Sequence, residues 1–184
     1  MKCSAFIATS LDGFIADSKG SIAWLEKANA SLPAGEDCGY RSFLSSIDVI
    51  VMGRKTFEQV MTFSEWPYSD MPVVVVSRTL RSLPKTTPAT VTLKNADPIA
   101  IVSYLQDRGY KSAYIDGGKL IQSFLSAGLI NEMTITLIPV VLGGGTSLFG
   151  ALERPIWVTL EDSKAYPFGF VQNRFRVSAS EYPR

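Results

Sequence analysis

Three stretches of this 184-residue chain are apolar almost without interruption, and they limit the folds that it can adopt. They read DVIVM at 48–52, PVVVVS at 72–77 and SAYID at 112–116. A sheet with one face in water shows alternating apolar and polar residues, whereas such runs are typical of strands covered on both faces. The chain is therefore predicted to be an α/β protein with helices flanking a sheet.

The remaining elements follow from periodicity and turn signals. Further strands are predicted at 4–9, 132–142, 155–162 and 170–179, and helices at 37–47, 55–62, 97–108 and 118–127. Asp97-Pro98 offers an N-cap followed by proline at the first helical position. After Asn131 only strand signals remain, which predicts antiparallel strands added to a mainly parallel sheet.

Composition excludes several classes of protein. A length of 184 residues fits one domain spanning 1–184, and 46% hydrophobic residues with a net charge of +1 indicate a globular protein and no nucleic-acid partner. The N-terminal apolar stretch is broken by Ser4 and Ser10, and no run approaches the ~18 residues of a membrane span. A cytoplasmic location without membrane contact is expected.

The chain contains no histidine, which excludes a Ser-His-Asp triad, a Cys-His pair and any imidazole acid or base within one chain. Cys3 and Cys38 are its only cysteines and form no C-x-x-C pair, so neither a metal site nor a disulfide framework is expected. If the chain is an enzyme, its proton donors must be carboxyl, Lys, Tyr or Cys groups, or water.

Glycine follows two of the predicted buried strands at the point where a helix begins. The first junction reads DVIVM-GRKT-FEQV and the second reads SAYID-GGKLI-QSFL. Ligands of open α/β sheets bind outside the carboxyl ends of the strands, where helix N-termini present free N–H groups, so two such junctions suit a pyrophosphate. Either junction alone is more simply explained as a turn, and neither matches a P-loop or G-x-G-x-x-G.

A third strand end adds Ser77 and Arg78 after PVVVV. A hydroxyl and a guanidinium there could hold the 2′-phosphate that distinguishes NADP from NAD, or Arg78 could be an ordinary exposed residue.

Taken in order, SLDGFIA, VMGRKTFE, VVVSR, the strand-GG-helix unit and LIPVVLGGGTSLF resemble the dihydrofolate-reductase-like superfamily. The similarity is to the branch that includes the C-terminal reductase domain of bacterial riboflavin biosynthesis proteins, and it covers about Lys2 to Val177. It implies a mainly parallel eight-stranded sheet with helices on both faces, antiparallel C-terminal strands, and NADPH across the carboxyl ends of the strands.

The same resemblance assigns cofactor-binding positions. Gly53, Arg54, Lys55 and Thr56 match the segment on the adenine-side phosphates, and Ser77 and Arg78 match the 2′-phosphate site. The pyrophosphate loop corresponds to Gly117, Gly118, Lys119, Leu120 and Ile121, and the nicotinamide-side wall with its mobile covering loop to Ala8, Ile15 and Ala16. The glycines of 143–145 shape a loop beside the site, a dimer contact or simply a flexible hairpin.

Folate reductases bind the pterin ring through a carboxyl at the start of the helix that precedes the V-x-M-G-R strand. Asp37 occupies that position, with Glu36 beside it, so both are candidate catalytic residues, although a carboxylate there also suits a helix cap. Tyr40 and Arg41 on the next turn are candidates for substrate binding, or Tyr40 belongs to the core.

The leading functional hypothesis is an NADPH-dependent reductase that acts on a pterin-like or ribosylaminopyrimidine-like heterocycle. The alternative is an NADP-binding sensor or partner protein that has lost catalysis. A purely structural domain without a ligand would leave the three junctions unexplained. Relatives are often dimers, and the apolar segment near 134–142 would suit a homodimer contact.

Overall fold

The structure is a computed structural model that describes residues 1–178. Its strands are β1 (Lys2–Ser10), β2 (Phe14–Ala16), β3 (Val49–Gly53), β4 (Val73–Val76), β5 (Val91–Lys94), β6 (Ser112–Asp116), β7 (Glu132–Ile138), β8 (Thr146–Ser147), β9 (Val158–Ala165) and β10 (Val171–Val177). Its helices are α1 (Ala23–Asn29), α2 (Tyr40–Leu44), α3 (Arg54–Val60), α4 (Pro98–Gln106) and α5 (Gly118–Ser126).

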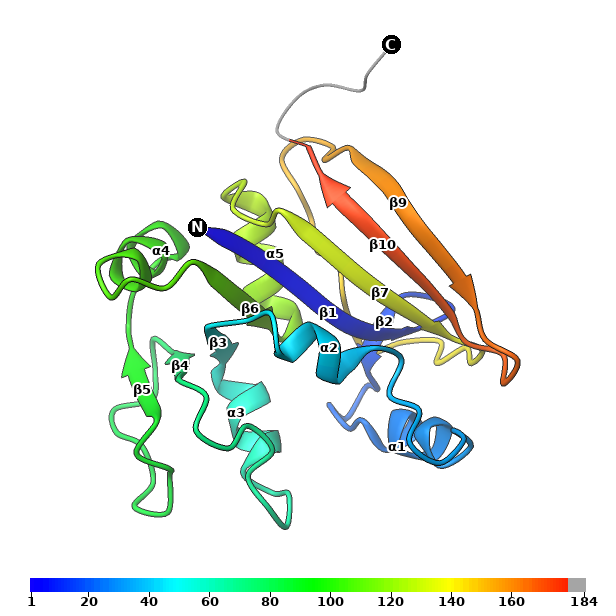
Figure 1. The fold of residues 1–184 in the computed structure, drawn as a ribbon, viewed down its shortest axis with the longest axis horizontal. Helices are drawn as coiled ribbons and strands as arrows, with labels where there is room; N and C mark the ends of the chain where they lie inside the picture. The colour runs from blue at the N-terminus through cyan, green and yellow to red at the C-terminus, as the bar shows by residue number, and fades with distance from the viewer. Residues whose placement is uncertain (179–184) are drawn as a thin grey trace.

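An eight-stranded sheet forms the centre of the fold, in the order β5-β4-β3-β6-β1-β7-β10-β9 (Figure 1). The pairs from β5 to β7 are all parallel, and β10 pairs antiparallel with both β7 and β9. A separate two-stranded ribbon joins β2 to β8. The predicted fold class, a mainly parallel sheet with antiparallel C-terminal strands, is confirmed.

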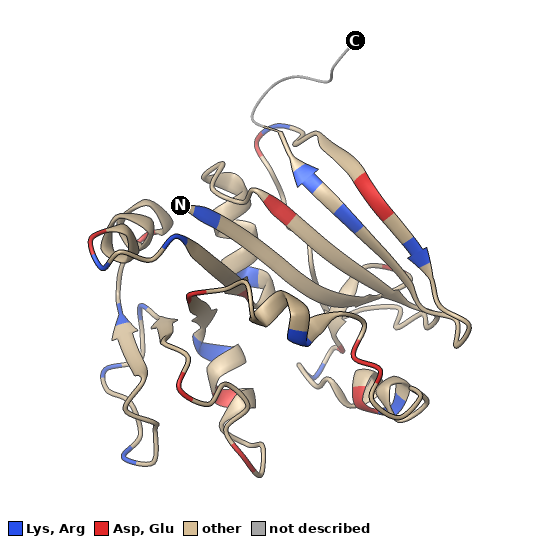
Figure 2. Ribbon diagram, in the orientation of Figure 1, with Lys and Arg blue, Asp and Glu red and all other residues tan. Residues whose placement is uncertain are grey.

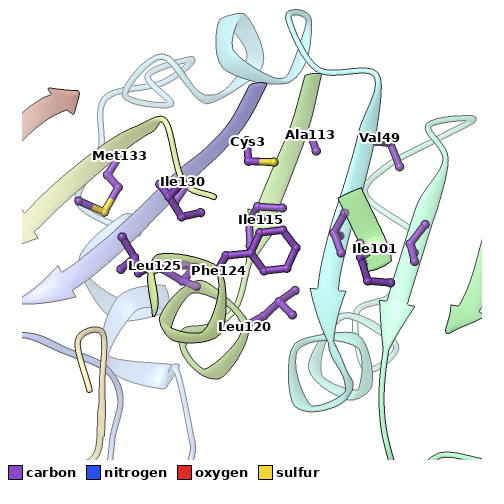
Figure 3. Packing of buried hydrophobic residues seen from close by; sticks show 14 of the residues in the cluster. Cys3, Val49, Ile101, Ala113, Ile115, Leu120, Phe124, Leu125, Ile130 and Met133 are labelled. Carbon is purple, nitrogen blue, oxygen red and sulfur yellow. The ribbon is translucent and has the colours of Figure 1, made fainter. Parts of the chain in front are cut away.

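Helices cover both faces of the parallel strands, which explains why these strands are continuously apolar. On one face Val49, Val51 and Ile115 pack against residues of α4 and α5, including Ile101 and Phe124 (Figure 3). On the other face Ile50, Met52 and Tyr114 pack with Phe57 of α3 and with rings of α2. Because successive strand residues point to opposite faces, each strand contributes to both cores.

Several predicted boundaries are wrong for local reasons. The strand predicted at 132–142 ends at Ile138, because Pro139 has no N–H for the ladder. The helix predicted at 37–47 is limited to α2, because Cys38 and Gly39 have φ of 53° and 81°, which a helix cannot include. The strand predicted at 155–162 lies at 158–165. Residue 179 of the strand predicted at 170–179 lies outside the described residues.

Four short elements, α1, β2, β5 and β8, were not predicted from the sequence. Each spans seven residues or fewer and, unlike the equally short strands β3, β4 and β6, none is part of a continuous apolar run. Within residues 1–178 no helix is both long and apolar enough to cross a membrane.

Candidate functional site

The two glycine junctions lie against each other at the carboxyl edge of the sheet. Met52 of β3 is the register partner of Asp116 of β6, so both strands end at the same level. Gly117 has a φ of +94°, and a Cβ atom placed on it would overlap the Thr56 hydroxyl. The sequence predicted each junction, and the structure brings them together.

Basic side chains surround these junctions. Arg54 and Lys55 open α3 and Lys119 lies in the first turn of α5, and all three side chains are exposed. Figure 2 shows basic positions in blue on both α3 and α5. Arg54 pairs with Glu58 at 3.8 Å across one helical turn, a weak and solvent-screened contact. Lys119 Nζ donates to Gln122 Oε1 at 3.4 Å. Because the whole chain has a net charge of only +1, this cluster of basic residues at the junctions is a local feature.

The strand β4 ends at the same edge and leads into the predicted 2′-phosphate segment. The Ser77 hydroxyl is buried and accepts hydrogen bonds from the N–H groups of Thr79 (3.2 Å) and Leu80 (2.9 Å). It therefore shapes its own turn. Arg78 is exposed and forms no ion pair within residues 1–178, so its guanidinium is available to a ligand.

Leu120 and Ile121 of the predicted pyrophosphate loop send their side chains into the core. The N–H of Ile121 donates to Gly117 O at 2.9 Å. Of these two residues, only Leu120 could therefore bind a phosphate through its N–H group, because the first N–H groups of a helix have no partner within it.

The predicted nicotinamide-side residues lie next to the start of α5. Ala8 is half-buried near the carboxyl end of β1. The Ile15 Cδ1 atom would be 2.6 Å from a Cβ on Gly118, so this side chain lies directly over the first helical residue. A Cβ on Gly145 would overlap the carbonyl oxygen of Ala16, so the glycine loop of 143–145 adjoins the covering loop.

The predicted catalytic carboxylates both bind backbone N–H groups at the start of α2. Asp37 accepts hydrogen bonds from Gly39 N (2.9 Å) and Arg41 N (3.1 Å), and also pairs with the Arg41 guanidinium at 3.2 Å. Glu36 accepts from Cys38 N at 2.7 Å. The hydrogen bond from Arg41 N to Asp37 supports the first turn of α2, as the alternative left open by the sequence expected, although the N-cap residue itself is Gly39. The Glu36 contact with Cys38 N lies ahead of the helix.

The predicted substrate residues separate, because Tyr40 turns inward and Arg41 is exposed. The Tyr40 ring lies 5.5 Å from that of Phe6 and 6.4 Å from that of Tyr114, between centroids. Burial raises the pKa of Tyr40 above its ordinary value, and the nearby Asp116 raises it further.

Asp116 is a buried carboxyl that the sequence analysis did not single out. Burial raises its pKa from 3.8 to about 6, and hydrogen bonds from Tyr114 and from the Gly117 N–H limit the rise. The Tyr114 hydroxyl also donates to Phe6 O at 2.9 Å, so its single proton serves one acceptor at a time. Burial likewise raises the pKa of Tyr68, and Asp116 and Tyr40 add to the rise.

The signal for Asp116 was present in the sequence. It is the one charged residue that ends the buried run SAYID, directly before two glycines. A carboxyl without a cation partner at the end of a buried strand is costly to ionise and marks a functional candidate.

A cavity of about 460 Å³ lies away from the glycine junctions. It is lined in part by Asp48 and Pro72, at the amino ends of β3 and β4.

A family model for the RibD C-terminal domain matches residues 2–171. The chain belongs to this family. The Bacillus subtilis protein YwjB is 34% identical over 168 residues, which cover 90% of this chain and 92% of YwjB. A solved structure from Shewanella sp. PV-4, of a protein ascribed to riboflavin biosynthesis, is 38% identical with a TM-score of 0.90, covering 97% of this chain and 99% of that one.

More distant structures share the fold. The Thermotoga maritima diaminohydroxyphosphoribosylaminopyrimidine deaminase/5-amino-6-(5-phosphoribosylamino)uracil reductase is 13% identical with a TM-score of 0.68, and the match covers 96% of this chain and 56% of that one. The resemblance to the branch that includes the C-terminal domain of bacterial riboflavin biosynthesis proteins is therefore confirmed.

Proposed function

We propose that the chain is an NADPH-dependent reductase that transfers a hydride to a small planar heterocycle of the pterin or aminopyrimidine class. The observation that carries the proposal is the meeting of the two glycine junctions beside buried Asp116. One edge of the sheet then offers a place for phosphates and, next to it, a group that can hold a proton.

The residues at this edge fit a dinucleotide phosphate. Gly117 and Gly118 let the Thr56 hydroxyl and the Ile15 side chain approach the start of α5, whereas a Cβ on Gly53 would meet no described atom within 4 Å, so the open space for a phosphate lies beside Gly53. Arg54, Lys55 and Lys119 are exposed cations beside the two junctions. Arg78 would hold the additional phosphate of NADPH, because guanidinium groups bind phosphate through two parallel hydrogen bonds.

NADPH, when bound, would supply the hydride. The substrate also needs a proton, and Asp116 is our candidate donor, because a carboxyl with a pKa of about 6 keeps part of its protons near neutral pH. The neighbouring Tyr114 hydroxyl and Gly117 N–H favour the ionised form and so lower the pKa of Asp116, against the effect of burial. Asp37 and Glu36 remain alternative candidates, although both already bind backbone N–H groups.

Two observations support the substrate class. The family is of the riboflavin-pathway type, and the Thermotoga maritima relative is named for the reduction of an aminouracil. On the α2 face of the sheet, the aromatic rings of Phe6, Tyr40, Phe43 and Tyr114 gather with centroid separations of 5.0 to 6.4 Å. A planar aromatic heterocycle suits an environment of this kind.

The proposal is tested by measuring NADPH oxidation with a panel of pterins, aminopyrimidines and simple carbonyl compounds. We expect at least one heterocycle to be reduced, with kcat lowered about 100-fold or more in Asp116→Asn, the size expected for loss of a general acid. Asp37→Asn is the matched comparison and should retain most of the rate. Loss of rate in Asp37→Asn alone would move the proton donor to Asp37.

If NADPH binds but none of these compounds is reduced, the reductase proposal fails. The NADP-binding protein without catalysis would then be favoured, because both functions require the same phosphate-binding residues.

A further inference from the structure

One exposed carboxylate joins two loops that are far apart in the sequence. Asp12, in the turn after β1, accepts hydrogen bonds from Gly143 N at 2.7 Å and Leu142 N at 3.1 Å. The Ser10 hydroxyl donates to the same carboxylate at 2.6 Å and accepts from Phe14 N at 2.9 Å. A single side chain thus fixes its own turn and the glycine loop that follows β7.

Further contacts extend this joint to the start of α5. The ribbon of β2 and β8 pairs the two loops, and Leu148 N donates to Gly13 O at 2.9 Å. The Gln122 side-chain amide of α5 donates to Ser147 O at 2.9 Å and Leu148 O at 3.2 Å. Ile15, carried by β2, lies against Gly118. The position of the covering loop over α5 therefore depends on contacts between the two loops.

The Asp12 contacts differ from those of an ordinary turn carboxylate. Asp17 binds Lys19 N and Ser21 N within its own turn, whereas the backbone partners of Asp12 are 130 and 131 residues away. The hydrogen bond from Ser10 is the main cause that lowers the pKa of Asp12, so the group stays ionised and acts as an acceptor rather than an acid. Its contribution is to hold the loops in position.

We propose that Asp12 is a positioning residue that fastens the loop bearing Ile15 and Ala16 over the start of α5, and so holds the nicotinamide-side wall in its cofactor-binding conformation. This role rests on the proposed function, because Ile15 and Ala16 form a nicotinamide-side wall only if the protein binds NADPH. The loop is then tethered even in the ligand-free protein, and NADPH binds a wall that is already in place.

The test compares Asp12→Asn with Asp48→Asn. Asp48 is a matched control because its carboxylate also accepts two backbone N–H groups across a long sequence separation, from Lys111 at 2.7 Å and Ser112 at 2.8 Å. It lies at the amino end of β3, away from the glycine junctions. In Asp12→Asn an amide NH₂ replaces one of the two oxygens that accept from Leu142 N and Gly143 N, so one N–H partner is lost. Both partners of Asp48 bind its Oδ2, so Asp48→Asn removes the charge and can keep both hydrogen bonds.

Two quantities are measured: amide hydrogen exchange of the ligand-free proteins by mass spectrometry, and the Kd for NADPH by quenching of tryptophan fluorescence. We expect Asp12→Asn to speed exchange in peptides covering 11–17 and 139–149 about tenfold or more, and to raise the Kd at least fivefold. Asp48→Asn should change neither quantity. Ser10→Ala removes one of the three bonds to Asp12 and also the acceptor of Phe14 N, and it should shift both quantities in the same direction.

Unchanged exchange in these peptides, or faster exchange with a wild-type Kd, would overturn the positioning role while leaving the proposed function standing. Failure of the wild-type protein to bind NADPH would overturn the proposed function and, with it, the role of Asp12. If Asp12→Asn does not fold, the same comparison with Ser10→Ala decides the question.

Discussion

Asp116 ends β6 with a carboxyl that is withdrawn from water, and it is the proton donor that we propose for this site. Its folded-state pKa of about 6 lies above the ordinary 3.8, because burial disfavours the ionised form. The folded protein therefore binds this proton more tightly than the unfolded chain does. Stability contributed by the protonated carboxyl should fall as the pH rises from about 4 to about 6.

Asp116→Asn removes the group that must ionise in the buried site. At pH 7.5 the variant should be more stable than the wild type by up to ~3 kcal/mol, since one pKa unit corresponds to ~1.4 kcal/mol and the shift is about two units. The gain should shrink towards pH 4, where both proteins carry a neutral group. Urea unfolding at the two pH values measures the difference. A gain of equal size at both would contradict the burial of an ionised carboxyl.

The tyrosines beside Asp116 show why this site was hard to recognise in the sequence. Tyr40, Tyr68 and Tyr114 come from α2, from the loop after α3 and from β6, and only the folded chain brings them near one carboxyl. The role of Asp37 at the start of α2, in contrast, depends on residues within four positions of it. Local contacts of that kind can be predicted from a sequence. Burial of the strand that ends in Asp116 was predictable too, but the gathering of three tyrosines around its carboxyl was not, because it depends on tertiary contacts.

At the scale of elements, the junctions at the ends of β3 and β6 determine the architecture of the site. They were predictable because a buried strand, a glycine and a helix start are each encoded locally. That Gly117 touches Thr56 was not predictable, because it depends on the register of β3 with β6. The ribbon of β2 and β8 was missed for a similar reason, since its two short strands are held by contacts with each other and with α5.

Gly117→Ala should disrupt the meeting of the two junctions. At φ +94° an alanine is strained, and its Cβ would also overlap the Thr56 hydroxyl. Gly128→Ala is the matched control, because its φ of +68° imposes backbone strain but its Cβ would meet no described atom within 4 Å. We expect losses of unfolding free energy of ~1 kcal/mol for Gly128→Ala and at least ~2 kcal/mol for Gly117→Ala.

The same pair of variants should differ in ligand binding. Gly117→Ala should weaken NADPH binding at least tenfold, while Gly128→Ala, at the far end of α5, should bind as the wild type does. Thermal unfolding with and without NADPH measures both effects. Equal NADPH affinity in the two variants would show that the Gly117 loop does not hold the cofactor.

At the scale of the whole molecule, the order of the strands limits where a second copy could bind. β7, within the segment predicted as a dimer contact, lies between β1 and β10, so neither of its edges is free. Exposed apolar side chains occur at Val141 (66% exposed), which follows β7 in the predicted segment, and on the outer strand β9, where Leu160 is 53% and Val158 38% exposed. A homodimer remains a prediction, and the outer strands offer it more apolar surface than β7 does.

The overall topology places every proposed binding element at one edge. Parallel strands β3, β4 and β6 end there together, each followed by one of the three segments that the sequence singled out. The hydrophobic pattern along the sequence predicted the fold class, because buried parallel strands and antiparallel C-terminal strands have different patterns. That the ligand at this edge is NADPH is our proposal, and it is the central claim to be tested.

Titration of the wild-type protein with NADPH and NADH, followed by tryptophan fluorescence, tests that claim most directly. NADPH should bind with a Kd in the micromolar range and at least tenfold more tightly than NADH, and Arg78→Ala should reduce this preference, because it removes the guanidinium available to the 2′-phosphate. Absence of NADPH binding at micromolar concentrations would contradict the proposed cofactor site. Equal affinity for the two nucleotides would contradict the assignment of Arg78.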